Sequence, residues 1–179
     1  MNSKTRLALA RIAALIVVVG LTVFIFINRD KASTLAAYGY PGIFLLAFVA
    51  YATVLLPAPG LAVVFTMGAV FNPFGVALAA AAGAALGEIS GYLTGFSGQA
   101  VIENMQLYQR MREWMKKNGP LTVLVLAAIP NPVFDLAGVT AGALKMPLVK
   151  FLFWCFLGQL IKMLLFAFVG STSLKTIFN

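Results

Sequence analysis

The amino-acid sequence predicts an all-α polytopic membrane protein. Of its 179 residues, 61% are hydrophobic and 10% are charged, and the mean hydropathy is +0.96. A soluble domain has about 45–50% apolar and about 25% charged residues. Long apolar runs recur along the chain, and short polar or Pro/Gly segments separate them. Most of the surface therefore faces lipid, and the length fits one compact domain.

Composition also restricts the chemistry. The chain has no histidine, five acidic residues and one cysteine, Cys155, inside an apolar run. We therefore expect no metal site, no intrachain disulfide, no cofactor and no enzymatic activity, and we interpret Cys155 as a small core residue. The net charge of +8 comes from basic residues beside the apolar runs, which is typical of loops held on the cytoplasmic side. We expect no nucleic-acid partner.

The first apolar run, residues 12–28, follows a basic segment, residues 1–11. It is long for a signal peptide, and "NRDK" follows it without a convincing small-residue cleavage site. We predict an uncleaved transmembrane helix with a cytoplasmic N-terminus.

Two later apolar stretches are interrupted by prolines. "PAPG" (Pro57, Pro59, Gly60) breaks residues 42–71, and "PNP" (Pro130, Asn131, Pro132) separates residues 120–129 from residues 133–144. Each arm is shorter than the roughly 17–25 residues of a spanning helix. We predict two re-entrant hairpins with these prolines at the tips, shielded by protein or lining a watery cavity.

Each hairpin precedes an apolar run that is long enough to span the bilayer, residues 76–97 and residues 148–170. In the first span Gly83, Gly87, Gly91 and Gly95 recur at four-residue intervals, which predicts a face for close helix packing within the chain or against a second copy. Between the two units, residues 101–117 place apolar side chains on one side of a helix and charged side chains on the other. This pattern predicts an amphipathic helix at the cytoplasmic interface with Trp114 as an anchor. Residues 172–179 form a polar tail.

The two units repeat each other. Pro57-x-Pro59 corresponds to Pro130-x-Pro132, and Gly68-Ala69-x3-Pro73 corresponds to Gly142-Ala143-x3-Pro147. Glu88 and Lys162 stand at the same separation after these glycines. Because a hairpin contributes no crossing, the copies, at about 41–97 and 119–170, are predicted to be oppositely oriented, as in secondary transporters.

The blocks "GAVFNPFGVALAAAAGAALGEISGYLTGFSG" and "IPNPVFDLAGVTAGALKMPLVKF" resemble the VTT domain, also called the SNARE-associated Golgi or DedA superfamily, over residues 40–171. The resemblance implies opposed re-entrant helices and lipid handling, by translocation or scrambling. Ala127 and Ala128 stand where family members usually carry an arginine, and no glutamate lies near Pro57. In the family these two groups are linked to proton-coupled transport of phosphorylated lipid carriers, so the resemblance does not extend to that substrate and coupling ion.

Three ionisable residues lie in apolar segments: Glu88, Asp135 and Lys162. Such groups are costly in lipid and should face protein or water. Glu88 and Lys162 are expected to meet, either as an ion pair that fixes helix register or as a polar path together with Gln159 and Asn131. Asp135 is either a helix N-cap or a protonatable group that gates transport.

These features favour a lipid translocase or scramblase in which a headgroup passes between the hairpins, and the headgroup of an anionic phospholipid is one candidate. A proton- or ion-coupled solute transporter on the same scaffold remains open, as does a membrane-organising protein that recruits a partner through residues 101–117. We expect membrane lipids as partners, leave a homo-oligomer open, and expect the plasma (inner) membrane of a prokaryote.

Overall fold

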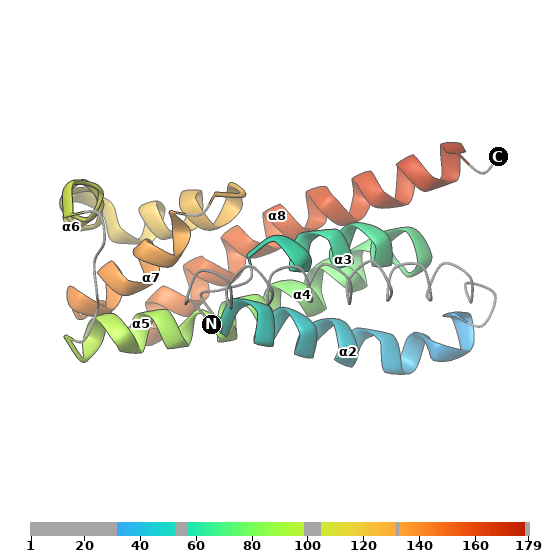
Figure 1. The fold of residues 1–179 in the computed structure, drawn as a ribbon, viewed down its shortest axis with the longest axis horizontal. Coiled ribbons are helices and arrows are strands. Elements are labelled where there is room, and N and C mark those ends of the chain that lie inside the picture. The colour runs from blue at the N-terminus through green and yellow to red at the C-terminus, as the bar shows by residue number, and fades with distance from the viewer. Residues whose placement is uncertain (1–31, 53–56, 99–104, 132, 178–179) are drawn as a thin grey trace, which may run out of the picture.

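The structure is a computed structural model that describes residues 32–52, 57–98, 105–131 and 133–177. This described part contains helices and no strand, as the sequence predicts (Figure 1). The helices are α2 (Ala32–Ala52), α3 (Pro57–Val70), α4 (Pro73–Gly87), α5 (Ile89–Phe96), α6 (Met105–Ala128), α7 (Phe134–Ala143) and α8 (Leu148–Ile177). The predicted helix at residues 12–28 and the N-terminal segment 1–11 lie outside the described residues.

Two stretches of the described chain are long and apolar enough to cross a membrane, Pro73–Phe96 and Leu148–Ser173. The first is α4 followed directly by α5, with Glu88 at their junction in a right-handed helical conformation (φ −64°, ψ −12°). Asn72 begins it, because its side chain accepts hydrogen bonds from the N–H groups of Phe74 and Gly75. Both stretches agree with the predicted spans at 76–97 and 148–170.

The shorter helices form two pairs at opposite halves of the long axis. Figure 1 shows α2 and α3 beside each other in one half, and the second part of α6 beside α7 in the other. The end of α2 and the beginnings of α3 and α7 lie near the middle of the molecule. The arms α3 and α7 have 14 and 10 residues, fewer than the roughly 17–25 of a spanning helix.

Three boundaries differ from prediction. Helix α2 begins at Ala32, runs through the exposed Pro41 and has 21 residues, so the prediction that every arm is shorter than a spanning helix is wrong for α2, although its apolar part is only Gly39–Ala52. Pro57, Pro59 and Gly60 belong to the first turn of α3 and do not form a separate tip; proline is tolerated there because a first-turn N–H has no partner within the helix. Most of the predicted polar tail continues α8 to Ile177.

Helix α6 contains a kink that divides the predicted amphipathic helix from the first arm of the second hairpin. Asn118 has non-helical torsions (φ −153°, ψ 76°), and Pro120 follows it. Before the kink, Met111 and Met115 are buried, whereas Trp114 and the basic side chains around it are exposed. The described part of the 101–117 segment is therefore amphipathic, as predicted; residues 101–104 lie outside the described residues.

Each hairpin packs on both long helices. Helix α2 packs on α4 and α6 packs on α8, whereas α3 packs on α8 and α7 packs on α5. Glycines permit the close contacts of α3 with α8 and of α7 with α5. A Cβ atom at Gly68 would collide with the backbone of Ala167 in α8, and one at Gly142 would collide with the backbone of Tyr92 in α5. Two buried apolar clusters result, one between α2, α3, α4 and α8 and the other between α5, α6, α7 and α8.

Candidate functional site: a buried polar cluster between the hairpins

Glu88 lies at the junction of α4 and α5 and is 2% exposed. Its carboxylate faces α7, because a Cβ atom at Gly138 would lie 3.4 Å from Glu88 Oε2. Next to it, Ser90 donates a hydrogen bond to the carbonyl oxygen of Ala52 at the end of α2 (2.9 Å). Glu88 is therefore enclosed where the first span meets an arm of each hairpin.

The second long helix contributes Gln159 and Lys162, which are 0% and 4% exposed. The Lys162 Nζ atom lies 5.3 Å from the centroid of the Tyr51 ring in α2 and 5.8 Å from that of the Phe134 ring in α7. Both distances fall within the roughly 6 Å at which a cation is attracted to an aromatic face. Lys162 is thus held between the end of one hairpin arm and the start of another.

Asp135 occupies the first turn of α7 and is half-buried. It is not the N-cap, since Val133 holds that position and the cap has no side-chain hydrogen bond. A carboxylate in the first turn still interacts favourably with the helix dipole. Asp135 therefore remains a candidate for a role beyond capping.

We call Glu88, Asp135, Gln159 and Lys162 the buried polar cluster. Lys162 interacts electrostatically with both carboxylates, but no ion pair joins it to Glu88 in the part of the chain that the structure describes. The expectation of a direct ion pair is therefore wrong, although α4 and α8 do pack together. Glu88 Oε1 and both polar atoms of the Gln159 amide are buried without a hydrogen-bonding partner. Buried polar atoms normally have a hydrogen-bonding partner, so these atoms can bind water or another polar group.

Asn131 organises the turn between α6 and α7. Its amide nitrogen donates to the carbonyl oxygens of Leu126 (3.0 Å) and Ile129 (2.8 Å), and its Oδ1 accepts from the N–H of Val133 (3.0 Å). Both ends of the Asn131 amide therefore bond to the backbone of the turn itself. Pro130 lies in this turn and is exposed; Pro132 lies outside the described residues.

The glycines of the first span divide between two partners. Cβ atoms at Gly83 and Gly87 would collide with the backbone of α2, at Phe44 and Phe48, and one at Gly95 would collide with Val139 in α7. Gly91 has more space, since its nearest neighbours would be 3.9 Å away. The described chain itself therefore occupies this face.

Sequence reasoning missed Tyr51, Ser90 and Phe134. Tyr51 and Phe134 stand just before the first Pro-rich break and just after the second. The presence of an aromatic residue near each break was the sequence signal that could have indicated these two residues. Ser90 carried no such signal, because its contact with Ala52 depends on how α2 packs on α4. Among the described residues no group of three or more acidic, cysteine or histidine side chains could hold a metal ion.

Comparison with known proteins identifies the family. The family model of the VTT domain matches residues 56–172, which is more than half of the chain. The chain belongs to the VTT-domain family. This result confirms the resemblance seen in the sequence, and with the two apolar spans it identifies an integral membrane protein. No solved structure matches the chain at a significant level.

A curated relative of this VTT-domain protein is the vacuole membrane protein KMS1 of Arabidopsis thaliana. It is 38% identical over 56 residues, which cover 29% of the present chain and 14% of the relative. The chain therefore spans only a small part of that relative's length.

The structure shows why a large side chain does not fit at Ala127, one of the two alanines where the resemblance placed an arginine of other family members. Ala127 is 0% exposed. A Cβ atom at Gly158 of α8 would lie 2.5 Å from its side chain, so α6 and α8 approach closely at this point. An arginine at Ala127 would have to separate these helices.

Proposed function

We propose that the protein moves the polar headgroup of a phospholipid or lipid carrier through the bilayer, as a lipid translocase or scramblase. The observation that carries the proposal is the buried polar cluster, to which α4–α5, α7 and α8 all contribute. Its unpartnered carboxylate and amide atoms lie inside helices that are otherwise apolar, where ionisable groups are costly and typically mark a transport path or another functional site. The headgroup would pass along this cluster while its acyl chains stay in lipid.

The proposal includes an inverted repeat of two re-entrant hairpins. Its support is the matched packing of the two units: Gly68 of α3 meets Ala167 of α8, and Gly142 of α7 meets Tyr92 of α5. Further support is that α4–α5 and α8 run in opposite directions, with one hairpin toward each end of the molecule (Figure 1). In this arrangement the two hairpins enter from opposite leaflets.

Cysteine accessibility tests the hairpins. In a Cys155→Ala background, single cysteines replace the exposed residues Pro41 and Asn72 around the first hairpin, and Leu121 and Lys145 around the second. We expect a membrane-impermeant maleimide to label both members of a pair from the same side, and the two pairs from opposite sides. Labelling of the two members of either pair from opposite sides would contradict the re-entrant topology.

Lipid movement is tested with the full chain in phosphatidylcholine vesicles that contain a trace of fluorescent phospholipid. We expect dithionite to quench inner-leaflet fluorophores in these vesicles, and not in protein-free vesicles, because the cluster offers headgroups a polar route. Proton-dependent solute uptake without lipid movement would instead favour a solute transporter. Loss of cellular function on deletion of the amphipathic segment, without lipid movement in vitro, would favour a membrane-organising protein.

Location in the plasma membrane of a prokaryote remains part of the proposal. The basic residues of the amphipathic segment are typical of cytoplasm-facing loops and support the orientation that this location requires.

A further inference from the structure

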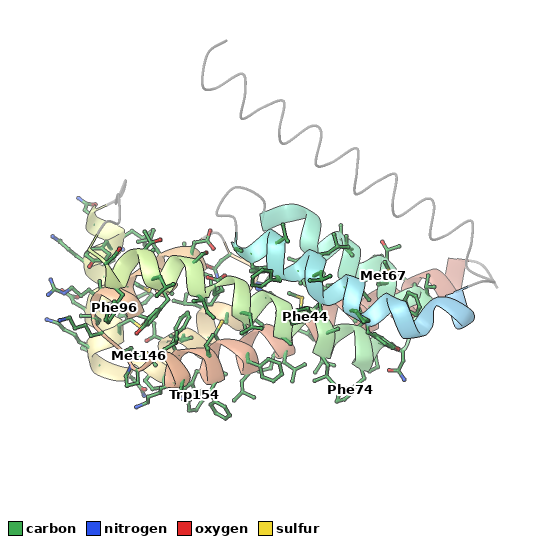
Figure 2. All side chains as sticks on the ribbon, turned by 90° about the horizontal axis from the view of Figure 1, so that it is seen from below. Phe44, Met67, Phe74, Phe96, Met146 and Trp154 are labelled. Carbon is green, nitrogen blue, oxygen red and sulfur yellow. The ribbon has the colours of Figure 1, made fainter. Side chains whose placement is uncertain are left out.

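A pocket of about 260 Å³ lies away from the buried polar cluster, where the kink in α6 meets the turn between α7 and α8. Its walls include Met115, Lys116, Pro120, Leu144, Met146 and Lys150. Figure 2 shows nitrogen-tipped side chains gathered at this end of the molecule, near the labelled Met146. The pocket therefore combines an apolar floor with two cations.

Both lysines are exposed, so their ammonium groups can reach a ligand without prior rearrangement. They come from different helices, Lys116 from α6 and Lys150 from the first turn of α8. Two positive charges in the wall of one pocket favour a bound anion. The expected ligand is thus negatively charged.

The backbone adds to the positive potential. Helix α8 begins at Leu148, and its first described helical hydrogen bond is donated by Phe151 to the carbonyl oxygen of Pro147, which leaves the earlier N–H groups of that turn without helical partners. The helical segment that follows the kink at Asn118 also begins at this pocket, with Gly119 and Pro120 in its wall. It adds less than α8, because Asn118 Oδ1 accepts a hydrogen bond from the N–H of Leu121 and Pro120 has no N–H. Helix N-termini favour phosphate groups.

The surroundings distinguish a lipid from a free anion. Helix α8 is a candidate span that starts at the pocket, and its first turns expose Val149 (80%) and Phe153 (57%). Acyl chains can lie along these side chains while the headgroup enters the pocket. The volume is smaller than the roughly 300–1,000 Å³ of a drug-sized site, which suits a headgroup.

We propose that this pocket binds the phosphate-bearing headgroup of an anionic membrane lipid. The site is separate from the proposed transport path and does not depend on lipid movement. It would hold an anionic lipid of the leaflet that borders the amphipathic segment.

The test measures equilibrium binding of fluorescent phosphatidylglycerol to the full chain in phosphatidylcholine nanodiscs. We expect Lys116→Gln/Lys150→Gln to weaken binding by about tenfold or more, since these two side chains line the pocket and would contact the headgroup directly. The matched control Arg112→Gln/Lys117→Gln removes the same charge from exposed positions outside the pocket and should change binding by less than about twofold. Equal weakening by both double variants, or by neither, would overturn the proposal.

A second variant tests the pocket without changing charge. A Cβ atom at Gly119 would lie 3.7 Å from Met146 Sδ and 3.8 Å from Met115 Sδ, which are ordinary contact distances. The Cβ atom of Gly119→Val is therefore accommodated, and its methyl groups should fill part of the pocket and weaken phosphatidylglycerol binding. Helical circular dichroism and gel filtration check that the variant folds. Unchanged binding in this folded variant would show that the lipid does not use the pocket.

Inorganic phosphate separates the two sources of the anion. At constant ionic strength, millimolar phosphate should displace little phosphatidylglycerol from the wild-type chain, because free phosphate makes no contact with the apolar floor. Complete displacement by phosphate, with no preference for phosphatidylglycerol over phosphatidylcholine, would reassign the pocket to a free anion and overturn the lipid proposal.

Discussion

Replacing Lys162 with alanine is expected to abolish headgroup transfer in reconstituted vesicles. Lys162 is the cation of the buried polar cluster and is only 4% exposed. Without it, the interacting carboxylates of Glu88 and Asp135 have no compensating charge in the cluster, so an anionic headgroup is repelled. We expect dithionite to quench the fluorophores of these vesicles no faster than those of protein-free vesicles. The control is Lys117→Ala, on the exposed face of α6, which should keep the wild-type rate.

The single variant also removes stabilisation, because an uncompensated buried charge costs about 3–5 kcal/mol. A double variant, Glu88→Gln/Lys162→Met, removes both charges and should fold at least as well as Lys162→Ala by thermal unfolding in detergent. It should nevertheless fail to move lipid. Wild-type transfer by the folded double variant would mean that the charges only support packing, and the assignment of the path would fail.

Asp135→Asn is an independent test of the same transport path. This change keeps the shape of the side chain at the start of α7 and does not remove a capping hydrogen bond, because the cap has none from a side chain. Reduced transfer with unchanged unfolding is expected. Unchanged transfer would restrict the path to Glu88, Gln159 and Lys162.

The second large effect concerns helix packing. Gly95→Ala is expected to lower the free energy of unfolding by about 1–3 kcal/mol, because the new methyl group would collide with the backbone of Val139 in α7. A backbone neighbour cannot move aside as a flexible side chain can, so α5 and α7 must separate. Thermal unfolding in detergent, followed by circular dichroism, measures the loss.

Gly91→Ala is the matched control one helical turn earlier. Its Cβ atom would meet its nearest neighbours, the Asp135 carbonyl oxygen and Glu88 Oε2, at 3.9 Å, an ordinary contact distance. Since alanine is favoured over glycine within a helix by about 0.5–1 kcal/mol, this variant should be as stable as the wild type or slightly more so. Equal destabilisation by both changes would contradict the packing account.

Much of the architecture could be predicted from local sequence signals. Apolar runs of sufficient length indicated the two spans, and the prolines and glycines near residues 57–60 and 130–132 indicated where helices are interrupted. The amphipathic segment was visible from the alternation of methionines with charged residues. These signals are local because helix formation and partition into lipid depend on residues within a few turns of each other.

The boundaries were less predictable. The apolar stretch of the first hairpin was expected to begin at residue 42, yet α2 begins at Ala32 and continues through Pro41. "PAPG" suggested a turn, yet it forms the first turn of α3. In both cases the same residue type is compatible with two local structures, and neighbouring helices select one of them.

The sequence by itself determined that this chain is helical, lies in a membrane and carries Glu88, Asp135, Gln159 and Lys162 inside apolar helices, because composition and spacing depend only on the order of residues. The tertiary structure decided which of these groups share one site. It directed Lys162 toward the rings of Tyr51 and Phe134 in place of a direct ion pair with Glu88, and it formed the pocket beside Lys116 and Lys150. The physical reason is that such contacts join residues far apart in the chain, and their geometry is set by how closely the glycines let the helices approach.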